Sequence, residues 1–163
     1  MAGDEITKIE VQDKEVREFL SRLNGMLQDT EPMMASISDI LGSITESQFA
    51  SESGPDGEPW KELAPSTIKQ REKSGKWPGK MLQMSDAGLA SSIQMEHGSD
   101  YAMIGPAKIY GRIHFLGGQA GRGQSVSIPA RPYMPVAKDG SLSETAKGDI
   151  LDIMQNYFKS ANP

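Results

Sequence analysis

Hydrophobic residues recur at helical spacing in two stretches near the amino end of the chain. The first stretch, from Val11 to Leu27, shows the i, i+3, i+4, i+7 pattern of an amphipathic helix. The second follows Thr30, a good N-cap, with Pro32 inside the first helical turn. Because only residues 28–30 separate the two helices, the pattern predicts an antiparallel helical hairpin over about residues 11–50. The hydrophobic positions are Val16, Phe19, Leu20, Leu23, Met26 and Leu27 in the first helix, and Met33, Ile37, Ile40, Leu41, Ile44 and Phe49 in the second.

A loop and a short helix follow the predicted hairpin. The loop runs from Ser51 to Trp60 and contains Pro-Asp-Gly, where Pro fixes φ and Gly allows a positive φ. We expect Trp60 to close the edge of the core rather than to stack on a ligand. A short helix over 66–73 then begins at Pro65 and ends at Gly75. Its basic residues, and those just after it, are interpreted as a solvated face: Lys69, Arg71, Lys73, Lys76 and Lys80.

The sheet-containing core is predicted over about residues 82–136. Strands at 91–97 and 101–105 are joined by a turn at 98–100. Residues 108–116 are ambiguous between helix and strand, and we favour a short helix ended by Gly117 and Gly118. Val126–Ile128 is a third strand, and Arg131–Met134 is a possible edge strand between prolines.

A last helix is predicted over about residues 142–160. Ser141 and Glu144 match a capping box, and the hydrophobic face behind them consists of Ala146, Ile150, Ile153, Met154 and Tyr157. Helices at both ends around a small antiparallel sheet make residues 1–163 a single α+β domain.

Charge is distributed unevenly along the chain. Residues 1–60 hold four Lys/Arg against thirteen Asp/Glu, whereas residues 61–163 hold thirteen against nine. Such a chain can associate head to tail or present opposite fields on two faces. The hydrophobic stripe of the first helix fits its own core or a neighbouring subunit equally well, and we favour the core.

The stretch from Ile109 to Met134 lies within the most basic part of the chain. No carboxylate occurs between Asp100 and Asp139. The loop QAGRGQ at 119–124 has no apolar anchor larger than Ala120, so we expect a flexible, positively charged loop between two ordered pieces. That arrangement favours a surface that meets a partner over a pocket. The basic residues of the span are Lys108, Arg112, Arg122, Arg131 and Lys138.

Composition excludes several classes of protein. With 37% hydrophobic and 24% charged residues, the chain is ordinary for a globular domain, and its 10 Met suggest a soft core. It has no Cys, which fits folding in a reducing cytoplasm. The polar, acidic start at 1–10 argues against a signal peptide. No apolar run approaches the ~20 residues that span a bilayer, so no membrane partner is expected.

No catalytic pattern is present in the sequence. His97 and His114 are the only histidines, and they lack the spacing of a metal-binding helix. A metal site of His97, Asp100 and His114 is conceivable but disfavoured. P-loop, nucleophile-elbow and Cys-nucleophile patterns are absent from the sequence. We therefore expect a protein that is not an enzyme and that uses no cofactor and no metal.

Nucleic-acid binding receives more weight than catalysis. Arg112, Arg122 and Arg131, with Tyr110 and Tyr133, supply the residue types that contact phosphates and bases. The net charge of −5 and the lack of a recognised module argue against a dedicated binder. We favour arginines that pair with carboxylates across a protein interface.

Five sequence pieces occur in a fixed order: Phe49 before PDGEPWKELAPSTIKQR, then LQMSDAGLASSI, YAMIG, IYGRIHFLGG and IPARPYM. Together they resemble the phage virion morphogenesis family, the small tail-completion proteins of Mu-like and related tailed phages. The resemblance covers roughly residues 45–160. Gly111 stands where a small residue such as Ala is expected, and Phe115 stands where Gln commonly follows the His.

The resemblance implies a structural protein that completes the tail or joins tail to head. It also implies a homo-oligomeric ring of about six copies that contacts the tail tube or the head connector, within a virion assembled in the host cytoplasm. A DNA-contacting head-closure or packaging accessory protein, and a chaperone absent from the particle, remain alternatives. Trp60, His114 and Pro129 are expected to define the fold. The expected interface residues, with passive DNA contact possible in the ring lumen, are Arg112, Gly117, Gly118, Gln119, Arg122, Gln124, Arg131 and Tyr133.

Overall fold

The computed structural model of the chain describes residues 14–137 and 139–161. The predicted polar start at 1–10, the first residues of the predicted first helix and Lys138 lie outside this part. Helices and two small antiparallel sheets alternate along the chain, which confirms the α+β class. The helices are α1 Lys14–Gln28, α2 Glu31–Ser51, α3 Pro65–Lys73, α4 Gly111–Leu116 and α5 Glu144–Lys159; the strands are β1 Ile93–His97, β2 Ala102–Pro106, β3 Gly118–Ala120 and β4 Val126–Ile128; short 3-10 turns lie at Ala90–Ser92 and Arg122–Gln124.

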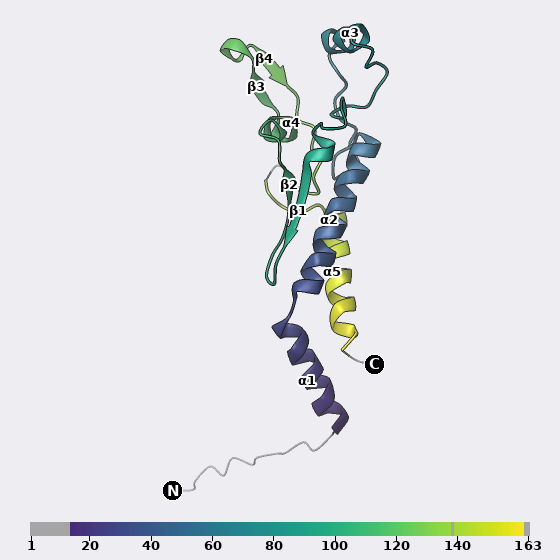
Figure 1. The fold of residues 1–163 in the computed structure, drawn as a ribbon, viewed down its shortest axis with the longest axis vertical. Helices are drawn as coiled ribbons and strands as arrows, with labels where there is room; N and C mark the ends of the chain where they lie inside the picture. The colour runs from purple at the N-terminus through teal and green to yellow at the C-terminus, as the bar shows by residue number, and fades with distance from the viewer. Residues whose placement is uncertain (1–13, 138, 162–163) are drawn as a thin grey trace.

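The molecule is elongated, and its shaft is formed by α2, α5 and the β1–β2 hairpin (Figure 1). Met33, Ile37 and Leu41 of α2 pack with Ala146 of α5, which is fully buried. The predicted hydrophobic face of α5 is confirmed, since Ile150, Ile153, Met154 and Tyr157 also pack against this cluster. The shaft therefore joins a helix from each end of the sequence.

The predicted pairing of the first two helices is wrong. α1 lies end to end with α2 along the long axis instead of folding back beside it (Figure 1), and no residue of α1 is buried. α5 takes the place beside α2 that the sequence assigned to α1. The end of α5 holds α1 through polar contacts: Arg22 Nε donates to the Ala161 carbonyl at 2.8 Å, and the Tyr157 hydroxyl donates to the Asp29 carbonyl at 2.6 Å. The short connection keeps the ends of α1 and α2 close together, but it does not determine the angle between the two helices.

A second core, rich in aromatic rings, lies beyond the carboxyl end of α2. The ring of Phe49 stacks on that of Tyr133 and meets that of Trp60 edge-on, with ring centroids 5.1 and 5.7 Å apart. Phe115 closes the cluster against Tyr133, with ring centroids 5.5 Å apart. Trp60 is 4% exposed, and its Nε1 donates to the Pro132 carbonyl at 2.8 Å. The expected position of Trp60 at the core is confirmed. Leu89 completes the cluster.

Two glycines allow the chain to pass close to this core. At Gly111, where Ala was expected from the resemblance, a Cβ atom would lie 2.6 Å from Pro106 Cγ and 2.9 Å from the Tyr133 hydroxyl. At Gly117, φ is +75° and a Cβ would lie 2.8 Å from the Ala130 nitrogen. Both positions therefore require glycine, the first for space and the second for backbone conformation as well.

The strands form two separate sheets instead of one. β1 pairs with β2 as predicted, with Ile93 opposite Pro106 and His97 opposite Ala102. β4 pairs with β3, a strand the sequence did not predict, with Gly118 opposite Ile128. The expected loop at 119–125 is thus a hairpin with a 3-10 turn at its tip. Residues 131–134 form no strand because Pro132 and Pro135 flank side chains that turn into the core.

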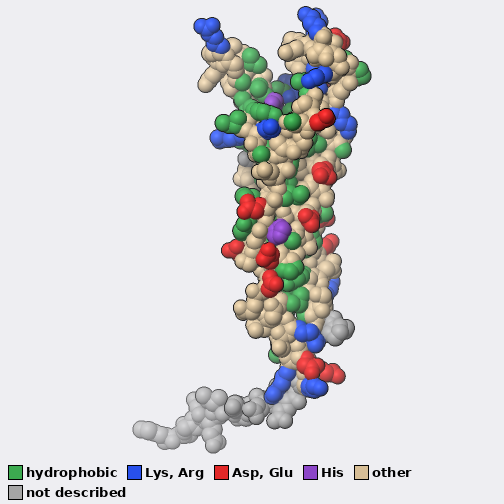
Figure 2. Space-filling model, in the orientation of Figure 1, with side chains coloured by type: hydrophobic (Ala, Val, Ile, Leu, Met, Phe, Trp, Pro, Cys, Tyr) green, Lys and Arg blue, Asp and Glu red, His purple; other side chains and the backbone are tan. Residues whose placement is uncertain are grey.

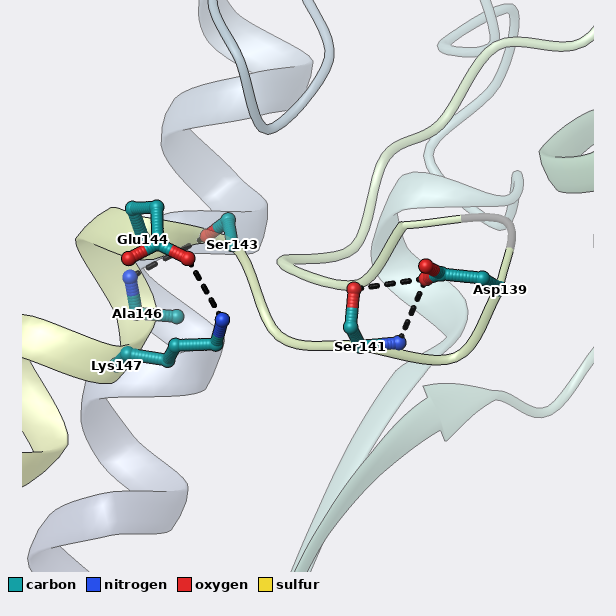
Figure 3. A network of polar contacts seen from close by, with 6 residues as sticks. All are labelled: Asp139, Ser141, Ser143, Glu144, Ala146 and Lys147. Carbon is teal, nitrogen blue, oxygen red and sulfur yellow. Dashed lines mark hydrogen bonds and ion pairs between the residues drawn. The ribbon is translucent and has the colours of Figure 1, made fainter.

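The cap of α5 differs from the predicted one (Figure 3). Ser143 is the N-cap, and its hydroxyl accepts a hydrogen bond from the Ala146 amide at 3.3 Å. Ser141 does not cap the helix, because its hydroxyl and amide both donate to the Asp139 carboxylate, at 2.7 and 2.9 Å. Glu144 pairs instead with Lys147 at 2.6 Å. The capping-box pattern placed the helix start two residues early.

Replacing Ser143 by Ala should lower the free energy of unfolding by about 1 kcal/mol, because the Ala146 amide loses its acceptor. Urea unfolding followed by circular dichroism measures the change. Ser141→Ala is the matched control and should have the smaller effect, since the Ser141 side chain is exposed and caps no helix. A larger loss at position 141 than at 143 would contradict this assignment of the cap.

Candidate assembly interface

One end of the molecule is forked, with α3 on one arm and the β3–β4 hairpin on the other (Figure 1). A cleft lies between this hairpin and α3 with its preceding loop. Its volume is about 720 Å³. Figure 2 shows a notch between the two arms, with hydrophobic side chains gathered around its base. The apolar residues that line the cleft include Leu63, Leu82, Met84, Leu89, Val126 and Ile128.

The β4 side of the cleft is a strand edge. Val126, Ser127 and Ile128 all line the cleft, although successive side chains of a strand point to opposite faces. β3 occupies the other edge of β4 and contributes no residue to the lining. The cleft therefore faces the backbone of β4 along its unpaired edge.

Arg131 lies at the base of the cleft and is 5% exposed. Its guanidinium donates to backbone carbonyls: Nε and Nη2 reach the Lys61 oxygen at 3.0 and 2.7 Å, and Nη2 reaches the Glu62 oxygen at 3.1 Å. Its backbone amide donates to the His114 carbonyl at 2.8 Å. Arg131 thus joins three segments of the chain, so this predicted interface residue also holds the fold together.

Arg71 of α3 also lines the cleft and is 6% exposed. Its Nη1 donates to the carbonyls of Gly79 and Lys80 at 3.4 and 3.0 Å, while its buried Nε has no hydrogen-bond partner. The expectation that this helix is only a solvated basic face is wrong for Arg71. The sequence offered a signal for this burial, since Arg71 lies one helical turn after Ile68, the large hydrophobic residue of the helix.

The two buried guanidiniums share one feature: within residues 14–137 and 139–161, neither forms an ion pair. Burial lowers the pKa of Arg131, the charge of Arg71 lowers it further, and Glu52 opposes the shift. Arginine keeps its charge in proteins, so the base of the cleft carries positive charge that nearby Glu52 offsets only in part. Such a site favours an anionic group.

His114 and Tyr133 adjoin the arginines. His114 lines the cleft, its Nδ1 atom is buried without a partner, and burial together with Arg131 lowers its pKa. The Tyr133 hydroxyl is also buried without a partner, and burial raises its pKa to about 12. Since Tyr133 is fully buried, its expected place at a partner surface is corrected; it belongs to the aromatic core.

The remaining expected interface residues lie on or near the surface. Arg112 is exposed on α4, and Gly118, Gln119, Arg122 and Gln124 are exposed on the β3–β4 hairpin. With its amide oriented to suit its neighbours, Gln119 donates to the carbonyls of Gln124 and Val126 at 3.2 Å. Gly117 and Pro129 are half-buried, and Pro129 lines the cleft. The sequence identified one arm of the cleft but missed the opposite arm and its base.

No three His, Asp or Glu side chains among the described residues lie close enough together to hold a metal ion. None of the helices in this part of the chain has the length and apolar character needed to cross a membrane.

The chain matches the model of the phage virion morphogenesis family over residues 11–159. It belongs to this family. The matched span includes both arms of the cleft and the whole shaft. Family membership confirms the resemblance drawn from the sequence pieces and assigns the chain a structural role in phage assembly.

Three relatives extend this family assignment. The chain is 35% identical over 123 residues to the putative capsid assembly protein G of Escherichia phage Mu, covering 74% of each chain. It is 34% identical over 115 residues to the Mu-like prophage FluMu G protein 1 of Haemophilus influenzae, covering 70% of this chain and 73% of that protein. It is 32% identical over 154 residues to FluMu G protein 2 of the same organism, covering 93% and 96%. No solved structure matches the chain.

Arg131→Lys should destabilise the protein by about 2 kcal/mol, because a lysine cannot reproduce the forked hydrogen bonds to Lys61 and Glu62 from a buried position. Arg122→Lys makes the same chemical change at an exposed site and should leave the free energy of unfolding within about 0.5 kcal/mol. Urea unfolding of the two variants gives the comparison. Equal stabilities would refute a structural role for Arg131.

Acid should destabilise the protein partly through His114. Because the folded pKa of this imidazole is lowered from 6.5, the unfolded chain takes up a proton first as the pH falls below that value, and stability falls with it. The free energy of unfolding should therefore drop more steeply from about pH 7.5 to about pH 5 in the natural chain than in His114→Gln. Urea titrations at each pH measure both curves; parallel curves would rule out this contribution.

Proposed function

We propose that the protein completes the phage tail and joins it to the head, as copies arranged in a ring in the neck of the virion. Membership of the virion morphogenesis family supports a role in building the particle. The observation that carries the finer proposal is the polarity of the molecule. Residues 61–80, around α3, hold six Lys/Arg against two Asp/Glu, whereas α2 in the shaft holds three carboxylates and no Lys or Arg.

An elongated subunit with a basic fork and an acidic shaft favours heterologous contacts between copies. Contacts of this type join different surfaces of identical subunits, and they close into a ring when the rotation between neighbours allows it. A ring suits the junction of head and tail, because both are built around a common axis. About six copies follow from the resemblance drawn from the sequence.

The exposed hairpin tip around Arg122 gives such a ring a contact surface for its neighbours in the particle. We assign the tail tube or the head connector as partner, and DNA in the lumen as a passive contact. The DNA contact is passive because the short β3–β4 hairpin, with Arg122 as its single arginine, offers too few cationic groups for strong binding to phosphates.

A second candidate function comes from a relative's name. The phage Mu protein is called a putative capsid assembly protein, and an assembly factor of this kind acts on the head and need not remain in the finished particle. The two functions predict different defects, so one genetic experiment separates them.

Loss of the gene should give filled heads and tails that accumulate separately, seen by electron microscopy of lysates. Mass spectrometry of purified particles should detect the protein in complete virions. Aberrant or missing heads, with the protein absent from virions, would instead support the capsid-assembly function.

Arg122→Glu should reduce the yield of joined particles, and the matched control Arg122→Lys should not; joined particles at the normal level in Arg122→Glu would exclude the hairpin tip as a contact.

A further inference from the structure

The second edge of β4 and the arginines at the base of the cleft indicate which kind of partner would fit there. The edge presents backbone donors and acceptors to a strand lying alongside it. The apolar walls, among them Leu82 and Met84, suit alternate hydrophobic side chains. Arg71 and Arg131, both buried and neither in an ion pair with the described residues, suit a carboxylate. An extended peptide that contains both β-branched and acidic residues fits all three features.

One segment of this chain has that composition. Residues 1–13, which lie outside the described part, contain four carboxylates against one lysine. Between Glu5 and Val11 the sequence reads EITKIEV, in which β-branched residues, favoured in strands, mix with glutamates. Its charge complements the base of the cleft, and its hydrophobic residues match the walls.

The geometry prevents this segment from reaching the cleft of its own chain. α1 and α2 contain 15 and 21 residues and lie end to end, with the cleft beyond the far end of α2 (Figure 1). At about 1.5 Å per residue, Lys14 is roughly 50 Å from the cleft along this path. Thirteen fully extended residues span at most about 45 Å. Only a different copy can supply the segment.

We propose that residues 1–13 of one copy bind as an added strand along β4 in the cleft of the neighbouring copy, with a carboxylate of the segment paired to Arg71 and Arg131. Each subunit then offers one segment and one cleft, and every subunit contacts its neighbours in the same way. α1 serves as the spacer that carries the segment out from the shaft. This inference rests on the proposed ring and specifies how its subunits are joined.

Cysteine cross-linking tests the exchange in the full-length chain, which contains no natural Cys. Ile9→Cys copies are mixed with Ser127→Cys copies, since Ser127 is exposed on β4 and lines the cleft. The matched control replaces Ser127→Cys by Ser36→Cys, which is exposed on α2 away from the cleft. Disulfides form only between closely apposed residues, so the 9–127 product should exceed the 9–36 product by about tenfold. Equal yields would overturn the proposal.

Native mass spectrometry of the same mixtures separates this inference from the proposed function. Closed rings without preferred 9–127 cross-linking would mean that the ring is held in another way and that the segment exchange is wrong. Preferred cross-linking in open chains would support the exchange and contradict the ring. If neither oligomers nor preferred 9–127 cross-linking were found, the ring and the segment exchange would both be contradicted.

A competition experiment tests the carboxylate part of the proposal. A synthetic peptide of residues 1–13 should suppress the 9–127 cross-link. The matched peptide, with Asp4→Asn, Glu5→Gln, Glu10→Gln and Asp13→Asn, should need roughly tenfold more for the same effect, because it offers no anion to the buried arginines. Equal potency of the two peptides would overturn the role of Arg71 and Arg131 in recognition.

Discussion

The forked end of the molecule depends on a set of hydrogen bonds that join residues 60–62 to residues 131–132. Arg131 donates three of them to the carbonyls of Lys61 and Glu62, and Trp60 donates a fourth to the carbonyl of Pro132. These contacts bridge about 70 residues of sequence. They close one side of the aromatic core and fix where the loop before α3 lies relative to β4, so the width of the cleft follows from them.

Using arginine for this task has an electrostatic consequence. Each guanidinium satisfies backbone carbonyls, whose partial charges do not neutralise it, and a second buried arginine lies close enough to lower the pKa of the first. The nearby hydroxyl of Tyr133 and Nδ1 of His114 are also buried without partners. The residues that stabilise the forked end therefore also carry positive charge, which an anionic partner would offset. The same residues serve the fold and prepare the surface.

Much of the fold could be predicted from the sequence, because periodicity and turn chemistry are local signals. The helices at 31–51, 65–73 and 144–159, the β1–β2 hairpin and the burial of Trp60 follow from such patterns. Helix pairing did not follow, since the stripes of α1 and α5 are equally suited to cover α2. Chain adjacency favoured α1, whereas the structure places α5 there.

The candidate site was only half visible in the sequence. Its exposed hairpin was recognised by its glycines and its lack of carboxylates, although the glycines were read as a loop and not as the strand β3. In the sequence, Arg71 and Arg131 cannot be told from surface charges, because composition does not reveal which charged side chains face backbone carbonyls. A cleft formed by segments around residues 63, 84 and 127 has no signature at any fixed spacing.

The shortness of β4 has a consequence for the timing of assembly. A strand of three residues offers too few backbone groups to capture a passing strand by hydrogen bonding alone, which protects single subunits from indiscriminate edge-to-edge aggregation. Stable pairing at this edge needs a second source of affinity, and the buried arginines supply one only to a chain of the right charge. In the proposed exchange, pairing therefore requires both a strand and a matching charge, and single subunits are expected to stay separate until both are supplied.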